Sequence, residues 1–588
     1  MVASAVTLAL ARNIRREPVI AAPPAPRLRL PEGWSLPALV VAVALLLGGL
    51  PFFRLAAAAF APGWQFAPGE AFVEMASRAA MTATWHTLET ASLSALGALL
   101  VGGIVALALG VTDVRGKRPL AFAFVFSMMI APQVAALAFL SLLAPNSPIL
   151  SLIGLAPPPG TPNPLLGRGG IILVMALHHA PLVAITLWTG LRSIPQSLVE
   201  AAQMEGATPA TITTRIVIPV LRPQIIAAGL IAFVAGVGNF GIPALLGLPV
   251  NYLTLPTLIY RRLSSFGPSS LGETAALAVL VGVVAALGIV AAALAARNQR
   301  GKVEIERSLE PYWLLGPARP FVAAGLWLLL ALKLGLPLLA LLSEALTPAL
   351  GVPLSWQTLT FDKFTEVLFR QAVTMRAFRN SLIFAGSAAL ILAILAIVFA
   401  YGLERRLGRF RRAVELMIEL PYALPGIVLA IACILIFLKP LPLIGVSIYG
   451  TPFIILFAYL ARFLPLALKA PVAAMAQIEA HHEDAAKLDG ANLPQMLRFI
   501  VAPILAPAAA VSALMVFLVA FNELTVSALL WSSGTETLGV VLFSLKEAGL
   551  AGEAAAVAIS ACVVILVVML ALDLIGRYRQ HNILPWRI

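Results

Sequence analysis

The stretch EAAQMEGATPATITTRIVIPVLRP, residues 200–223, returns as DAAKLDGANLPQMLRFIVAPILAP at residues 484–507. The two copies start 284 residues apart and keep a glycine (Gly206, Gly490) and two later prolines at the same spacing. Fixed self-similarity over half a chain length is the signature of a duplicated architecture. The sequence therefore predicts two homologous halves, each carrying one copy of this segment.

The composition of the chain is that of a membrane protein. Of its 588 residues, 60% are hydrophobic and only 11% are charged, and the mean hydropathy is +0.96. Soluble domains carry roughly a quarter charged residues. These values exclude a soluble globular protein, a disordered chain and a disulfide-built secreted domain. The net charge of +13 is spread over short loops, so we expect contact with membrane lipid and none with nucleic acid.

About twelve segments are long and apolar enough to cross a bilayer as helices. We therefore predict an all-α polytopic membrane protein with two parallel six-helix repeats. The predicted spans are residues 36–53, 86–111, 120–143, 170–190, 224–246, 273–295, 321–344, 381–403, 415–438, 450–470, 505–530 and 554–575.

The basic residues predict the orientation and the division of the chain. About two thirds of the 40 lysines and arginines fall on the side of the two termini, which the positive-inside rule places in the cytoplasm. The first residues lack the charge order of a secretory signal, so no cleavage is expected. The predicted units are a cytoplasmic lead-in (1–35), a first transmembrane domain (36–296), a linker (297–320) and a second transmembrane domain (321–588).

The repeated segment falls in a loop between the fourth and fifth spans of each half. Gly206 is suited to end a short helix in the left-handed conformation, and Thr208 or Asn492 is suited to cap the next one. Prolines at the entrance to the fifth span predict a kink there. The remaining candidate contacts of this loop are Glu200, Ala201, Ala202, Pro219, Asp484, Ala485, Ala486 and Pro503. The paired alanines predict a small-residue face for a partner; the alternative is a surface helix that packs only on its own bundle.

The pattern E-A-A, three residues, Gly, nine residues, Ile and two spaced prolines resembles the signature of permease subunits of binding-protein-dependent ABC importers. The second copy departs from it at Asp484 and Ala502. The resemblance implies that each loop docks on one of two cytoplasmic ATPase subunits. No GxxxxGK[ST] segment occurs in the sequence, so ATP is expected on those partners and the chain itself is expected to be no enzyme and to hold no cofactor.

Few ionisable residues fall inside the spans, and these are candidates for the pathway. Glu523 corresponds to Asn239 in the first half; the pair either lines a central gate or forms hydrogen bonds between helices. Glu419, before Pro421, is a further pathway candidate. For the histidine pair at 178–179, packing or a turn near the surface is favoured over metal binding. Cys433 and Cys562 are expected to be small buried hydrophobic residues, and no metal site is expected.

Segments from Asn239 and Phe521 onward are similar to fused ferric-iron permeases of the bacterial inner membrane. This resemblance implies iron(III) as substrate, delivered by a periplasmic binding protein that docks on outer loops 54–85, 247–270 and 345–379. Thiamine, phosphonate and polyamine permeases are close alternatives. An ion-coupled secondary transporter also has two six-helix halves, but it requires coupling-ion residues in the spans and no repeated docking loop. A membrane scaffold or enzyme is a third class, and no nucleophile–base pair supports it.

Overall fold

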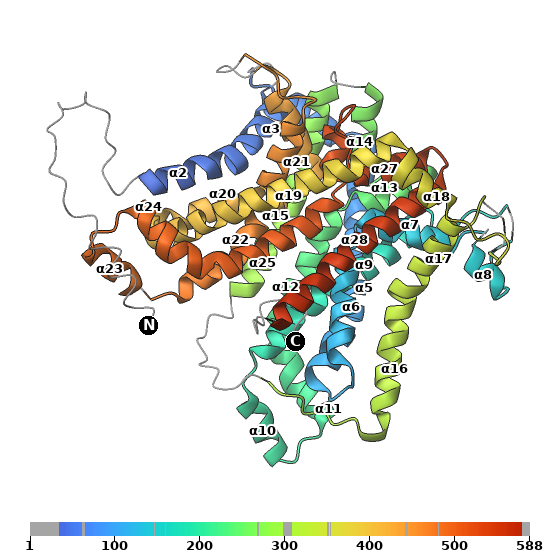
Figure 1. Ribbon diagram of the computed structural model, residues 1–588, viewed down its shortest axis with the longest axis horizontal. Helices are drawn as coiled ribbons and strands as arrows, with labels where there is room; N and C mark the ends of the chain where they lie inside the picture. Colours follow the sequence, from blue (N-terminus) through green and yellow to red (C-terminus); the bar gives the residue numbers. More distant parts are fainter. Residues whose placement is uncertain are drawn as a thin grey trace.

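The computed structural model describes residues 35–61, 65–145, 147–158, 160–266, 270–297, 309–349, 352, 354–440, 445–479 and 481–578. Within these residues every regular element is a helix (Figure 1), and one isolated bridge joins Thr112 to Trp313. Residues 1–34 of the predicted lead-in and residues 298–308 of the predicted linker lie outside the described residues. The all-α prediction is confirmed.

The long helices of the two halves follow the same order. Those of the first half are α2 (Ser35–Ala44), α3 (Leu50–Phe60), α5 (Arg78–Val111), α6 (Lys117–Met129), α7 (Pro132–Leu142), α9 (Arg168–Arg192), α12 (Ile218–Val237) and α15 (Leu271–Arg297). Those of the second half are α16 (Arg319–Leu330), α17 (Leu336–Leu346), α19 (Ala372–Tyr401), α20 (Arg411–Ala423), α21 (Gly426–Phe437), α22 (Pro452–Gln477), α25 (Ala502–Phe521) and α28 (Ala551–Tyr578).

Short helices fill the connections. They are α4 (Pro68–Met75), α8 (Pro148–Leu152), α10 (Gln196–Met204), α11 (Pro209–Ile212), α13 (Gly241–Gly247), α14 (Leu255–Phe266), α18 (Asp362–Thr365), α23 (His481–Leu488), α24 (Leu493–Met496), α26 (Ser527–Leu530) and α27 (Leu538–Glu547). Among the described residues, ten helical runs are long and apolar enough to cross a membrane, and the third span of each half is broken in two. Together these match the twelve predicted spans.

The third span of each half is broken at a proline, and in the second half this break lies where Pro421 and Pro425 predict a kinked helix. The axes of α6 and α7 differ by 101°, and those of α20 and α21 by 102°. In each case the residue before a proline, Ala131 or Leu424, is extended (ψ 146° and 149°). The proline ring disfavours helical backbone at the preceding residue, so the chain turns there.

The fifth spans begin earlier than predicted and run through their prolines. Each is one helical run, residues 209–237 and 493–521, without a sharp kink at Pro219 or Pro503. A wide π turn, Thr213–Val217 or Leu497–Val501, ends two residues before each proline. Proline has no backbone N–H to donate, and a wider turn accommodates its ring within a helix. The prediction of a kink at the entrance is therefore wrong.

The first helix of each half packs against the other half. Gly48, between α2 and α3, lies against the carbonyl of Met417 in α20, where a Cβ atom would collide. Arg54 Nη2 donates to the carbonyl of Leu435 in α21 at 3.1 Å. In the reverse direction, α17 packs against α7 of the first half, as well as against α28 of its own half. The two halves are thus held together by an exchange of helices.

Beyond this exchange the halves diverge as two arms. In Figure 1, α23 lies at the tip of the arm formed by α22 and α25, and α10 lies at the tip of the arm that contains α5, α9 and α12. One hydrophobic core with side chains from both halves joins the arms at their other end. The repeated loops are therefore the parts of the two halves that project farthest from this shared core.

Candidate functional site

The repeated loops have the same backbone structure in both halves. Gly206 and Gly490 adopt left-handed conformations with φ of +78° and +77°, which confirms the predicted helix ends. The amide of the following residue donates to the carbonyl five residues earlier in both copies, at 2.9 Å, which closes the end of the helix.

The predicted caps of the second helix are also present. Thr208 Oγ1 accepts from the amide of Thr211 at 3.3 Å. Asn492 Oδ1 accepts from Gln495 N at 3.0 Å, while Gln495 Oε1 accepts from Asn492 N at 2.9 Å, a reciprocal capping box. Each loop is therefore a helix, a left-handed glycine and a capped second helix.

The outward face of these loops differs from the predicted small-residue face. Glu200, Ala201 and Asp484 are exposed, but Ala202 is half-buried and Ala486 is buried against its own bundle. The side chain of Ala485 lies outside the described residues. The prediction of paired exposed alanines therefore does not hold for the second alanine of either copy.

Two large apolar side chains occupy the exposed face in their place. Met204 and Leu488 are each 89% exposed and stand at equivalent positions of the repeat, two residues before the left-handed glycine. A single exposed apolar side chain on a surface is ordinary. The same exposure at the same position of both copies is a repeated feature of the two loops, which a single chance exposure does not explain. The sequence could have indicated this exposure, because Met204 and Leu488 are apolar residues at helix ends that are otherwise polar.

The two loops are attached to the molecule by different contacts. Beneath the first loop lies the chain that joins the halves: Tyr312 Oη is 2.9 Å from Thr213 Oγ1, and the amides of Tyr312 and Trp313 both donate to the carbonyl of Val111. Burial raises the pKa of the Tyr312 phenol, which stays a neutral hydrogen-bonding group. Beneath the second loop, Arg405 Nε forms a 2.6 Å ion pair with the buried carboxylate of Glu483.

The predicted pathway pair, Asn239 and Glu523, lies just beyond the ends of α12 and α25. Asn239 Oδ1 accepts from the amide of Ile242 at 3.1 Å, at the start of α13. Both oxygens of Glu523 accept from the amide of Val526 at 3.0 Å, at the start of α26. Both side chains are buried and hydrogen-bonded, so each holds the bend after its fifth span.

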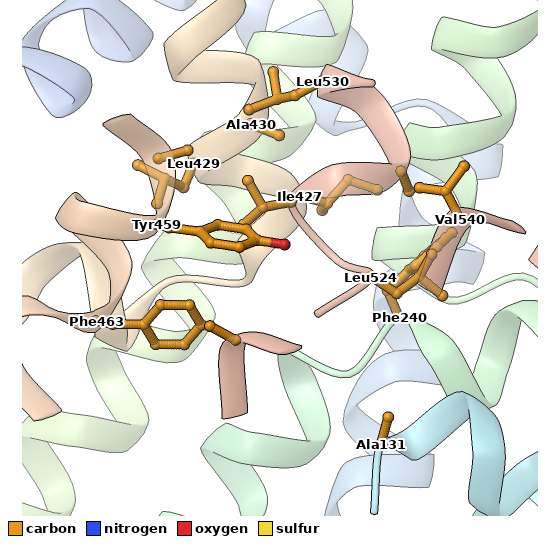
Figure 2. Close-up of a cluster of buried hydrophobic side chains, with 14 of the residues drawn as sticks. Ala131, Phe240, Ile427, Leu429, Ala430, Tyr459, Phe463, Leu524, Leu530 and Val540 are labelled. Carbon is orange, nitrogen blue, oxygen red and sulfur yellow. The ribbon is translucent and has the colours of Figure 1, made fainter. Parts of the chain in front are cut away.

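A layer of buried side chains lies between the two halves at the level of these bends. The equivalent residues Phe240 and Leu524 are both buried in it, and Figure 2 shows them side by side with Val540. Gln133 Nε2, from the first half, donates to the carbonyl of Asn522 in the second at 2.8 Å. The positions equivalent to these two residues are Gly426 and Gly238, so this hydrogen bond is made on one side only.

The other candidate residues are placed as follows. Glu419 is exposed on α20, in a hollow that also contains Arg412 and Glu415. The histidines at 178–179 lie in the middle of the continuous helix α9, where His179 is buried, so of the two favoured alternatives the structure shows packing rather than a turn. Both cysteines are buried and unpaired, as predicted. The described residues contain no group of three or more His, Cys, Asp or Glu side chains that could hold a metal.

Comparison with known proteins assigns this architecture to a family. Residues 393–583 match the model of the binding-protein-dependent transport system inner membrane component. A putative ABC transporter permease, ORF1 of Streptomyces antibioticus, is 33% identical over 175 residues, which cover 30% of this chain and 74% of that protein. The chain belongs to the ABC transporter permease family.

Two further relatives show how far the similarity extends along the permease. The probable ABC transporter permease y4fN of Sinorhizobium fredii is 25% identical over 79% of this chain and 82% of its own length. The ferric transport system permease FbpB of Actinobacillus pleuropneumoniae is 27% identical over 70% of this chain, but the alignment spans only 58% of that relative.

Proposed function

We propose that this permease forms the translocation pathway of an importer in which two cytoplasmic ATPase subunits bind its repeated loops. The observation that carries the proposal is the pair of loops at the tips of the two arms, each presenting an exposed apolar side chain beside a left-handed glycine. The docking surface comprises Glu200, Ala201, Met204, Gly206, Asp484, Leu488 and Gly490. The chain then contributes units 36–296 and 321–588, joined by 297–320, with both termini and both loops in the cytoplasm.

The substrate we propose is ferric iron, handed over by a periplasmic binding protein at the opposite end of the molecule. The support is the similarity to ferric transport permeases and the family's dependence on binding proteins. The segment 247–270, expected to be an open docking loop, contains α14, and its Leu255 and Ile259 are fully buried. Val250, Asn251 and Arg261 of the same segment are exposed, so the proposed docking surface comprises the exposed parts of segments 65–77, 248–265 and 354–371.

The experiment that tests the assembly is copurification. The tagged permease, coexpressed with the ATPase and binding protein encoded beside it, should retain two ATPase chains per permease in detergent. Uptake of radioactive iron by a strain that lacks the permease gene should fall and return with the plasmid copy. If this strain kept its iron uptake but lost uptake of labelled spermidine, the protein would still be an importer, but its substrate would be a polyamine and not iron.

A further inference from the structure

A small cavity lies where the first helix of the second half meets the first half. It has a volume of about 30 Å³, and its wall includes Lys333, Ser127 and His178 among apolar side chains. Lys333 belongs to the π turn Ala331–Gly335 between α16 and α17, while the serine and the histidine come from α6 and α9. The cavity therefore spans the boundary between the two halves.

Lys333 is held firmly in this place. Its side chain is buried, with 7% of the residue exposed, and Nζ donates to Ser127 Oγ at 2.6 Å. The ammonium also lies 4.3 Å from the centre of the Phe124 ring. Ser127 donates its own hydroxyl hydrogen to the carbonyl of Phe124, so its lone pairs are what the lysine contacts. An ammonium has three N–H donors, so the bond to Ser127 leaves two of them, at the wall of the cavity, without a hydrogen-bond acceptor among the described residues.

Within the part of the chain that the structure describes, no carboxylate pairs with this lysine. An unpaired charge is costly in the hydrocarbon region, where intramembrane cations normally pair with an acid or face water. Lys333 is the third residue of a π turn in the middle of a 31-residue apolar run, far from either end. In the described residues, an ammonium at this position therefore lacks an acidic partner.

The duplicated half shows that the fold does not need this lysine. The corresponding π turn, Leu45–Gly49, also precedes a Leu-Pro pair, and its third residue is Leu47. The position equivalent to Ser127 is Leu420 when α6 and α20 are aligned on their following prolines. At these two positions the other exchanged first helix packs with apolar side chains, so Lys333 and Ser127 are an addition that the packing itself does not require.

His178, on the other side of the cavity, also differs in chemistry from its equivalent in the second half. Its repeat equivalent is Arg462, whose Nε lies 4.0 Å from the carboxylate of Glu523. The residue equivalent to Glu523 in the first half is the neutral Asn239. Arg462 thus lies beside an acid of its own half, whereas His178 shares the cavity wall with Lys333 of the other half and with no acidic residue.

We propose that this cavity binds a small monovalent anion such as chloride. The volume suits one ion of that size, and the donors on its wall are the ammonium of Lys333 and the ring N–H of His178. The anion neutralises the buried lysine and fastens the first helix of the second half to α6 and α9 of the first. It would be a structural ion at the junction of the halves, separate from the loops and bends assigned to transport.

The test is the thermal stability of the purified full-length permease in sodium chloride against sodium gluconate at equal ionic strength. The unfolding midpoint of the wild type should rise by about 1–2 °C for each tenfold increase in chloride. Lys333→Leu, which copies Leu47, should remove this dependence. Lys469→Leu is the matched control, because Lys469 also lies over an aromatic ring, that of Tyr422, but is exposed and lines no such cavity.

Two outcomes would overturn the proposal. One is a wild-type midpoint that is the same in chloride and gluconate, which would mean that the lysine is held as a neutral amine. The other is a Lys333→Leu protein that still responds to chloride. Should Lys333→Leu fail to fold, His178→Leu provides the same comparison, and bromide should give an anomalous diffraction peak in this cavity in wild-type crystals.

Discussion

Met204 and Leu488 are the residues on which the docking proposal depends most directly. Each is almost fully exposed at the end of a short helix, so neither contributes to the core of the permease. Apolar anchors buried at the centre of an interface commonly account for much of its binding energy. Their matched positions imply that each anchors one ATPase subunit.

Replacing Met204 by glutamate should therefore weaken retention of the ATPase at one loop. A charge forced into an apolar pocket at a hot spot costs about 2 kcal/mol or more, roughly a 30-fold loss of affinity. The measurement is ATPase titration onto the permease in nanodiscs. Met204→Leu, which copies the second loop, is the control and should bind normally. Equal affinity for the glutamate and leucine variants would remove Met204 from the interface.

Gly206 provides a second test at the scale of one residue. Its φ of +78° is open to glycine and tolerated by asparagine, whereas proline is confined to negative φ. Gly206→Pro should abolish substrate-dependent ATP hydrolysis, while the protein still inserts into the membrane. Gly206→Asn should retain most of the activity. Full uptake by the proline variant would contradict the role of this turn in coupling.

The different contacts beneath the two loops have a consequence at the scale of the element. Glu483→Gln leaves Arg405 without its partner in a partly buried site, which should destabilise α23 by about 2 kcal/mol. Amide hydrogen exchange in α23 should then accelerate roughly 30-fold, with α10 unaffected. Glu479→Gln, at an exposed carboxylate, is the control. Equal acceleration in both loops would mean that they move as one unit.

Whether an element could be predicted depends on how far apart in the sequence the residues that determine it are. The twelve spans, the left-handed glycines and the caps follow from residues a few positions apart, and all are present. The prolines of the ninth span predict the kink that is found before Pro425, and the break before Pro132 could have been predicted from the same local signal, the residue that precedes a proline. The buried helix α14 could not, because its apolar run is too short to distinguish a buried hairpin from an exposed loop.

At the scale of the whole molecule, contacts between distant segments escape sequence patterns. Hydrophobic periodicity shows that a helix has an apolar face but not which helix covers it, so the exchange of first helices was not foreseen. The same applies to Gln133 and Asn522, which are 389 residues apart and unremarkable within their own spans. Few charged residues fall within the spans, and for that reason the sequence indicates Glu523 as a candidate. The hydrogen bond that joins the halves instead involves two neutral residues, Gln133 and Asn522.

That hydrogen bond leads to a prediction for the transport cycle. Gln133 Nε2 and the carbonyl of Asn522 join the halves in the buried layer that contains Phe240 and Leu524. An importer must separate its halves here to pass a substrate, so the bond favours the closed state by about 1 kcal/mol. Gln133→Ala should shift the population several-fold toward the open state and raise ATP hydrolysis without binding protein by a similar factor.

The control for this variant is Gln357→Ala, an exposed glutamine on the outer surface, which should leave hydrolysis unchanged. The measurement is ATPase activity of the reconstituted complex with and without binding protein. A several-fold rise confined to the reaction without binding protein would fit a hydrogen bond that holds the halves closed, because on the proposed function the binding protein itself shifts the wild type toward the open state. Unchanged basal hydrolysis in Gln133→Ala would mean that apolar packing around Phe240 and Leu524 holds the halves closed without help from this bond.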